Sequence, residues 1–347
     1  MSSTVEHYVP VREDWLARRR EEALDPALPI IDPHHHLWDR PGWRYLLPDL
    51  LADTNQGHNV VATVFVQCRA MHRAEGPDAM RPVGETEFVN GVAAMSASGG
   101  YGPTRVCGGI VGHADLMLGA AVREVLEAHL RAGGGWFRGI RHITSWDPDP
   151  VIMNPAYQPP EDIFFRDDFR RGFAQLAPLG MSFDAWLYHP KIPDLTALAR
   201  AFPETPIVLD QCGGVLGIGR YAGRRDEVFA QWFAALRDLA ACPNVMVKLG
   251  GLGMRLPGFG FEAGERAPSS AALAEAWRPW IEGCIETFGA ARCMVESNFP
   301  VDKGGYGYSV GWNAFKRLAA GASAEEKADL FWRSAARFYR LPGVEPS

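Results

Sequence analysis

Pro29-Ile30-Ile31-Asp32-Pro33-His34-His35-His36-Leu37-Trp38 is the segment that predicts both the fold and the site. Its apolar start is typical of a buried strand. Because strand side chains alternate between two faces, His34 and His36 should point into one common space, with Asp32 one step deeper on that face. His35 should point the other way, into packing or a hydrogen bond. Neutral imidazole is a common zinc ligand, so this strand end is predicted to form half of a metal or water-activating site.

Seven further apolar runs of strand length follow, at residues 60–67, 105–112, 137–143, 181–188, 206–209, 244–249 and 292–296. A helical pattern follows each run, and eight such units predict a (β/α)8 TIM barrel. We assign it to one domain, residues 29–347, after an N-terminal arm, residues 1–28, with a charged helix near 11–22. A doubly wound open sheet is the alternative, but no Gly-x-Gly-x-x-Gly follows the first strand. The long segment 144–165 is expected to be a lid or binding loop.

The composition is that of a soluble globular protein, with 47% hydrophobic and 22% charged residues. A formal charge of -6 without a long basic run argues against nucleic-acid binding. The six cysteines form no Cys-x-x-Cys pair and are expected to be reduced and buried. The first residues lack the features of a signal peptide, and no run of eighteen apolar residues occurs. We therefore expect a cytoplasmic protein that binds a small molecule rather than a membrane; the apolar arm and loops would permit a homodimer.

Polar residues recur where the apolar strands end. In a barrel the carboxyl ends of the strands meet at one mouth, where catalytic groups gather. So many polar groups there would sacrifice packing unless they had a chemical use. The residues are His34, His36, Gln67, His113, Arg141, His142, His189, Gln211, Lys248, Glu296 and Asn298.

From about residue 28 to 341, the sequence resembles the amidohydrolase-related, metal-dependent hydrolases of the TIM-barrel type (amidohydrolase family 2), within them the lactonase-like group. The resemblance implies a cytosolic hydrolase that opens lactones with water, while some relatives decarboxylate or hydrate unsaturated acids. Seven segments carry it in the expected order, at residues 32–38, 83–89, 137–142, 183–190, 208–214, 247–252 and 296–303.

The resemblance places the metal-binding or water-holding pair on His34 and His36, and a third histidine on His189. Two positions depart from the family pattern. Gln211 stands where the family generally has histidine, and Asn298 where much of the wider family has aspartate. An amide is neither a strong general base nor a good metal ligand, so the full metal set is broken.

Glu296 is the favoured general base, because alternation aims it at the barrel interior together with Asn298. Asp302, in the following loop, is the second choice. Arg141 would bind a substrate carboxylate or the reaction's oxyanion. The other predicted substrate contacts are Lys248, Lys303, Gln211, Trp38 and Trp146. For Lys248, an ion pair with Asp210 or Glu296 is an equally good interpretation.

Two mechanisms for lactone hydrolysis remain open. In one, His34, His36 and His189 hold one Zn2+ or Mn2+ and Glu296 takes the proton of bound water. In the other, of nearly equal standing, no metal takes part and the histidines hydrogen-bond water and carbonyl directly. Two further alternatives are a metal-dependent decarboxylase or C–C lyase acting on an aromatic or unsaturated acid, and a non-catalytic binding barrel.

Overall fold

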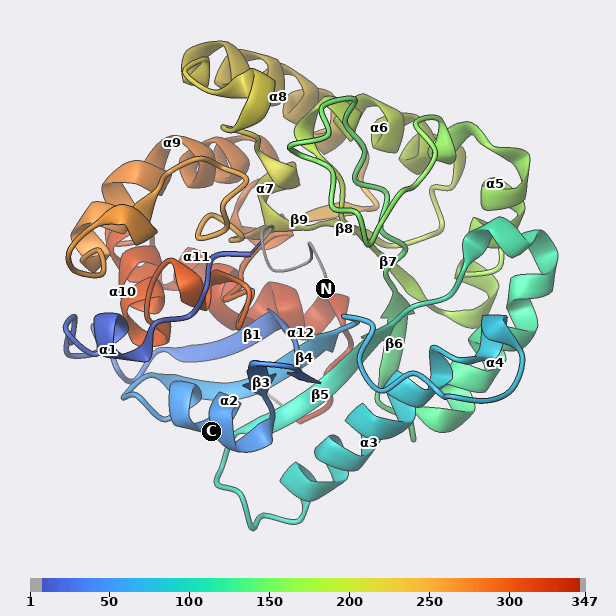
Figure 1. Ribbon diagram of the computed structural model, residues 1–347, viewed down its shortest axis with the longest axis horizontal. Helices are drawn as coiled ribbons and strands as arrows, with labels where there is room; N and C mark the ends of the chain where they lie inside the picture. Colours follow the sequence, from blue (N-terminus) through green and yellow to red (C-terminus); the bar gives the residue numbers. More distant parts are fainter. Residues whose placement is uncertain (1–7, 344–347) are drawn as a thin grey trace.

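Eight parallel strands form a ring in the computed structural model, which describes residues 8–343 (Figure 1). Their order around the ring follows the sequence, β1-β4-β5-β6-β7-β8-β9-β10. They are β1 (Pro29–His35), β4 (Asn59–Val66), β5 (Arg105–Gly112), β6 (Phe137–Ile140), β7 (Ser182–Ala185), β8 (Ile207–Leu209), β9 (Val245–Leu249) and β10 (Cys293–Val295). The predicted (β/α)8 TIM barrel is confirmed.

Backbone hydrogen bonds beyond the end of β10 bring the last strand back to the first. The Asn298 amide donates to the His34 carbonyl at 2.9 Å, and the His36 amide donates to the Phe299 carbonyl at 2.8 Å. The first and last strand ends are therefore joined at the mouth of the ring, where His34 and Asn298 lie. A small antiparallel hairpin, β2 (Trp38–Arg40) with β3 (Trp43–Tyr45), follows β1.

Helices surround the ring and cover its outer face (Figure 1). They are α1 (Glu13–Leu16), α2 (Leu47–Thr54), α3 (Val83–Ala97), α4 (Val122–Ala132), α5 (Asp167–Phe173), α6 (Ile192–Ala201), α7 (Gln211–Gly214), α8 (Arg225–Ala240), α9 (Ser270–Phe288), α10 (Tyr308–Leu318), α11 (Ala324–Ala328) and α12 (Ser334–Phe338). The shorter 3-10 or π segments are η1 (Asp78–Met80), η2 (Leu116–Ala121), η3 (Ile163–Phe165), η4 (Ala177–Leu179), η5 (His189–Lys191), η6 (Gly219–Tyr221), η7 (Phe261–Ala263), η8 (Ala290–Arg292), η9 (Asp302–Gly304) and η10 (Asp329–Arg333). Within residues 8–343, no helix combines the length and apolar character needed to cross a bilayer.

The barrel interior has its own apolar core, separate from the core between strands and helices. Side chains such as Val64 and Val208 point inward and pack against Phe338 and Tyr339 at the end of the chain. These C-terminal residues close one end of the barrel. The polar residues at the carboxyl ends of the strands therefore lie at the opposite, open end.

The N-terminal arm packs over the body through side-chain bonds to backbone carbonyls. Trp15 donates to the Gly264 carbonyl, and Arg19 donates to the Ala267 carbonyl. The helix predicted near 11–22 is wrong in length, because only Glu13–Leu16 is helical and these bonds hold the following residues instead. Residues 1–7 of the predicted arm and 344–347 of the predicted barrel domain lie outside the described residues. All six cysteines are free and buried, as predicted.

Candidate active site

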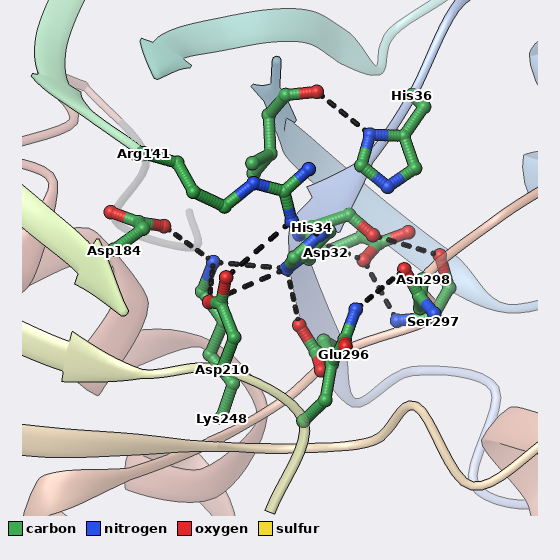
Figure 2. A network of polar contacts seen from close by, with 12 residues as sticks. Asp32, His34, His36, Arg141, Asp184, Asp210, Lys248, Glu296, Ser297 and Asn298 are labelled. Atoms are coloured by element: carbon green, nitrogen blue, oxygen red, sulfur yellow. Dashed lines mark hydrogen bonds and ion pairs between the residues drawn. The ribbon is translucent and has the colours of Figure 1, made fainter. Parts of the chain in front are cut away.

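His34 lies at the centre of a buried polar cluster below the barrel mouth (Figure 2). Its Nδ1 is 2.7 Å from Glu296 Oε2 and 3.6 Å from Asp210 Oδ1. Its Nε2 is 3.1 Å from an Nη of Arg141. Because a guanidinium can only donate, His34 Nε2 accepts this hydrogen bond, while Nδ1 faces the Lys248 ammonium at 3.2 Å as well as Glu296. Glu296, the predicted general base, therefore contacts His34 directly.

Lys248 adds an ammonium group to this cluster from β9. Its Nζ is 2.7 Å from Asp184 Oδ2 and 3.1 Å from Asp210 Oδ1, and all three side chains are fully buried. Tyr339, from the C-terminal closure, donates to the same Asp184 oxygen at 2.6 Å. Of the two predicted roles for Lys248, the structure therefore shows the ion pair, with Asp184 as a partner that the sequence did not suggest.

Burial and charge set the protonation states of this cluster. Burial, followed by the nearby Lys248 ammonium, lowers the pKa of His34 to about 3, so the ring is neutral. Burial alone would raise the pKa of Asp210, but Lys248, His34 and Arg141 hold it well below its usual range. Burial raises the pKa of Glu296 well above its usual value, and Lys248 only partly opposes this. The ionised carboxylate Asp210 and the cations beside it form the fixed charges of the cluster.

A divalent metal does not fit this donor set. Within residues 8–343, His34, Asp210 and Glu296 form the one group of donors whose atoms lie within 4.8 Å of one another. Yet Lys248 Nζ is 3.2 Å from His34 Nδ1 and 3.1 Å from Asp210, while Arg141 is 3.1 Å from His34 Nε2. These donor atoms already face two positive charges, which would repel a metal ion.

Above the cluster, a cavity of about 780 Å3, including its open part, occupies the barrel mouth. None of the residues that line it within the described part of the chain is acidic, whereas three are arginines. The lining residues are Tyr8, Val9, His36, Trp38, Arg40, Cys68, Arg141, Ile143, Ser145, Ile152, Asn154, Tyr157, Trp186, Tyr188, Gln211, Met254, Arg255, Leu256, Asn298 and Val301. The predicted binding loop 144–165 contributes four of them.

Of the predicted histidine pair at the end of β1, His36 lines this cavity and His34 does not. Its ring centroid lies 5.0 Å from that of His34 and its ring stacks on Trp38, so the predicted common space is present. Nδ1 lies 2.7 Å from the Val66 carbonyl, which can only accept, so Nδ1 carries the proton and Nε2 has a free lone pair. Figure 2 shows Nε2 on the side of the ring away from that bond. Burial, then His34 and Arg141, lowers the pKa of His36 well below 6.5.

The two departures from the family pattern, Gln211 and Asn298, contact each other. Gln211 Nε2 donates to Asn298 Oδ1 at 2.9 Å, and both side chains line the cavity. Both residues hold left-handed backbone conformations, with φ of 56° and 54°. Such conformations cost energy and gather at functional sites. Gly251 is required beside them, because a Cβ there would lie 2.4 Å from Gln211 Cβ.

Several predicted site residues lie elsewhere. His189 does not join His34 and His36 as a ligand triad, because it follows the end of β7 by four residues and packs against Tyr221. Lys303 is wrongly predicted as a substrate contact, since its Nζ pairs with Asp53 and Glu13 at 3.0 and 3.1 Å.

Trp146 does not line the cavity, because its ring packs under Lys191 Nζ at 5.1 Å. Glu296, the predicted base, is buried under His34 and does not line the cavity either.

Sequence reasoning missed Asp184 and assigned Asp210 only as an ion-pair partner. Both are carboxylates at or next to short apolar strands, β7 and β8. A lone carboxylate inside an apolar strand must find a buried partner, and the lysine in β9 is its natural one. Opposite charges in neighbouring apolar strands could therefore have predicted this buried ion pair from the sequence.

Comparisons with known proteins agree with this architecture. The family model described as amidohydrolase matches residues 31–341. The chain is 33% identical over 335 residues to the uncharacterized protein y4mH of Sinorhizobium fredii, covering 90% of this chain and 98% of that protein. It is 28% identical over 328 residues to an L-fucono-1,5-lactonase of Burkholderia multivorans, covering 90% and 96%.

Among solved structures, the chain is similar to an amidohydrolase from Burkholderia multivorans that was crystallised with bound zinc. The TM-score is 0.69 and the sequence identity 27%, over 90% of this chain and 99% of that one. The zinc is a feature of that structure.

Proposed function

The chain belongs to the amidohydrolase family and is a hydrolase, and on that premise we propose that it opens a lactone ring with water activated by His36. The observation that carries the proposal is the state of His36. It is a neutral imidazole in the cavity wall, with its proton tied to the Val66 carbonyl and its other nitrogen free. The relative named L-fucono-1,5-lactonase supports a lactone as the substrate class.

His36 can carry the proton through the whole reaction. Its Nε2 takes a proton from water while the water oxygen bonds to the lactone carbonyl carbon. When the tetrahedral intermediate collapses, the bond between this carbon and the ring oxygen breaks. The protonated His36 then gives its proton to the ring oxygen, which leaves as a hydroxyl group. Because burial disfavours the charged ring, His36 releases this proton readily.

Arg141 is placed to stabilise negative charge on the carbonyl oxygen. One Nη donates to His34 and the other donates to the Gln67 carbonyl at 2.5 Å, which fixes the guanidinium in place. Its Nε is buried and has no hydrogen-bond partner within residues 8–343, although the side chain lines the cavity. Preorganised donors of this kind stabilise an oxyanion strongly where water is excluded. The hydroxy acid that is formed also carries a carboxylate, which Arg141 can bind.

The His34 cluster holds Arg141 rather than reacting itself. His34 Nε2 accepts from Arg141, and Asp210 Oδ2 lies 3.5 Å from the same guanidinium nitrogen. The Asp210 carboxylate and the His34 lone pair therefore orient the cation from below. No step of the proposed reaction requires a metal.

The proposal is tested with purified protein and a panel of five- and six-membered lactones, with acid release followed by a pH indicator and CO2 measured in parallel. We expect acid without CO2, and we expect His36→Asn to lower kcat/KM by about 100- to 10,000-fold. His189→Asn is the matched control, because His189 lies outside the cavity, and it should retain most of the activity. Release of CO2 would indicate decarboxylation instead, and a fully active His36→Asn enzyme would exclude His36 as the base.

A further inference from the structure

Three side chains form a line of hydrogen bonds from behind the cavity to its wall. Asn298 Nδ2 donates to Asp302 Oδ1 at 2.8 Å, and Gln211 Nε2 donates to Asn298 Oδ1 at 2.9 Å. We call Asp302, Asn298 and Gln211 the amide network. Asp302 and Asn298 are fully buried, and Gln211 is 4% exposed. Only Asn298 and Gln211 line the cavity.

The direction of these bonds is fixed from the Asp302 end. The Gly253 amide donates to Asp302 Oδ2 at 2.8 Å, and the Tyr306 hydroxyl donates to the same oxygen at 3.1 Å. An ionised carboxylate only accepts, so Asn298 must turn its NH2 group toward Asp302. The Asn298 carbonyl oxygen then faces Gln211, which must donate in turn. The amide oxygen of Gln211 is then the one atom of the amide network that is left without a partner within the described residues.

This oxygen, Gln211 Oε1, is a hydrogen-bond acceptor without a partner. It is buried and receives no hydrogen bond from residues 8–343, although its side chain forms part of the cavity wall. A buried acceptor left unpaired is unfavourable in the free protein, so a ligand that donates a hydrogen bond to it binds more tightly. The left-handed backbone of Gln211 and its close approach to Gly251 leave the side chain little freedom to turn away.

We propose that Gln211 is a specificity-determining residue that accepts a hydrogen bond from a hydroxyl group of the lactone, in an orientation that Asp302 sets through Asn298. The inference rests on the proposed function and names the substrate class more closely, as a hydroxylated lactone. An amide oxygen is too weak a base to take the proton of the attacking water. A group that donates to Gln211 Oε1 therefore keeps its proton, as a hydroxyl group of the substrate would.

Two substitutions test separately the presence of the acceptor Gln211 Oε1 and its orientation. Gln211→Met keeps the length of the side chain and removes the acceptor. Asp302→Asn replaces no residue that lines the cavity, but it reverses the direction of the network. The Gly253 amide and the Tyr306 hydroxyl still need an acceptor, so the new carbonyl faces them and the new NH2 faces Asn298. Asn298 and Gln211 must then both flip, and Gln211 turns NH2 to the cavity.

The kinetic test uses a hydroxylated six-membered lactone and its monodeoxyfluoro analogues at pH 8, because fluorine is close in size to hydroxyl but cannot donate. For one ring position, the wild type should show a hydroxyl-over-fluoro ratio of kcat/KM of at least tenfold. Gln211→Met should lower kcat/KM for the hydroxylated lactone about tenfold and bring that ratio near one. Asp302→Asn should also bring the ratio near one, because the flipped NH2 can donate to fluorine. Tyr306→Phe removes one bond to Asp302 without reversing the network and should keep the ratio.

A neutron diffraction map of the wild-type protein reads the orientation independently of any substrate. Deuterium on the Gln211 nitrogen should point at Asn298, and deuterium pointing into the cavity would overturn the inference. Equal losses for both lactones in Asp302→Asn would also overturn it, since they would indicate a structural role. If the wild type hydrolyses no lactone, the proposed function is wrong, and so is the proposal that Gln211 binds a hydroxyl group of a lactone. The neutron map would still decide the orientation of the amide network.

Discussion

The ammonium nitrogen of Lys248 lies 3.1 Å from Oδ1 of Asp210. A metal ion bound by His34, Asp210 and Glu296 would have to contact the same carboxylate as this ammonium group. A fixed cation in this position replaces the charge that a divalent ion would supply. We therefore expect dialysis against a strong chelator to leave the lactone-hydrolysing rate within about twofold of its starting value. Metal content is measured by mass spectrometry on the same samples. Loss of activity on chelation, with recovery on adding Zn2+ or Mn2+, would contradict this.

Removing the buried ammonium should be costly for the fold. Lys248→Met leaves Asp184 and Asp210 buried without their cation, and breaking such a pair typically costs about 3–5 kcal/mol. Urea unfolding, followed by circular dichroism, measures the loss. Lys191→Met is the control, because its pair with Asp194 is partly exposed and should contribute less than about 1 kcal/mol. Equal effects of the two substitutions would show that the buried cluster is not the stronger interaction.

Strand alternation was enough to predict the first part of the site. It placed His34 and His36 in one space and turned His35 away, where its Nε2 lies 2.8 Å from Thr63 Oγ1. The eight apolar runs correspond to the eight barrel strands, because continuous apolar strands are typical of a parallel sheet covered by helices.

Alternation fails once a strand has ended. His189 was placed by extending the strand to residue 188, but β7 stops at Ala185 and the chain then turns into η5. Lys303 likewise lies in η9, which turns it to Asp53. The contact between Gln211 and Asn298 joins residues 87 positions apart and depends on two left-handed backbones, which no local pattern indicates.

The pH dependence of the reaction should report the low pKa of His36. Burial, then His34 and Arg141, lowers this pKa well below 6.5, and the base is active only when neutral. For a lactone without the hydroxyl group that Gln211 would bind, kcat/KM should therefore stay constant from pH 8 to pH 6 and fall only at lower pH, when His36 gains a proton. A pH profile in buffers of constant ionic strength measures this. An acid limb centred at or above pH 6.5 would indicate another base.

The N-terminal arm should contribute to substrate affinity. Tyr8 and Val9 line the cavity, and Val9 is seated on Gly304, where a Cβ would lie 2.2 Å from the Val9 carbonyl oxygen. Gly304→Ala must therefore displace the arm, and we expect KM to rise several-fold with a smaller change in kcat. Gly321→Ala, at a position with open space around it, is the control. Unchanged KM in Gly304→Ala would show that the arm does not contact the substrate.

Asp302 should make the stability of the fold depend on pH in a predictable direction. Burial raises its pKa from 3.8 to about 7, against hydrogen bonds from Gly253, Asn298 and Tyr306. Between these two values the folded protein binds the proton more tightly than the unfolded chain, so the stabilising contribution is complete below pH 3.8 and is lost as the pH rises to 7. The upper bound on this loss is about 4 kcal/mol, at about 1.4 kcal/mol for each pKa unit.

The measurement compares urea unfolding of the wild type and Asp302→Asn at pH 4 and pH 8. Other buried carboxyl groups that do not interact with Asp302, such as Glu85, are present in both proteins, so their contributions cancel in the difference. The wild type should lose stability relative to Asp302→Asn by up to about 4 kcal/mol between the two pH values. Parallel behaviour of the two proteins would mean that Asp302 titrates at its ordinary pKa and is ionised at low cost. In that case the amide network would keep its direction well below neutral pH, rather than losing it as Asp302 gains a proton.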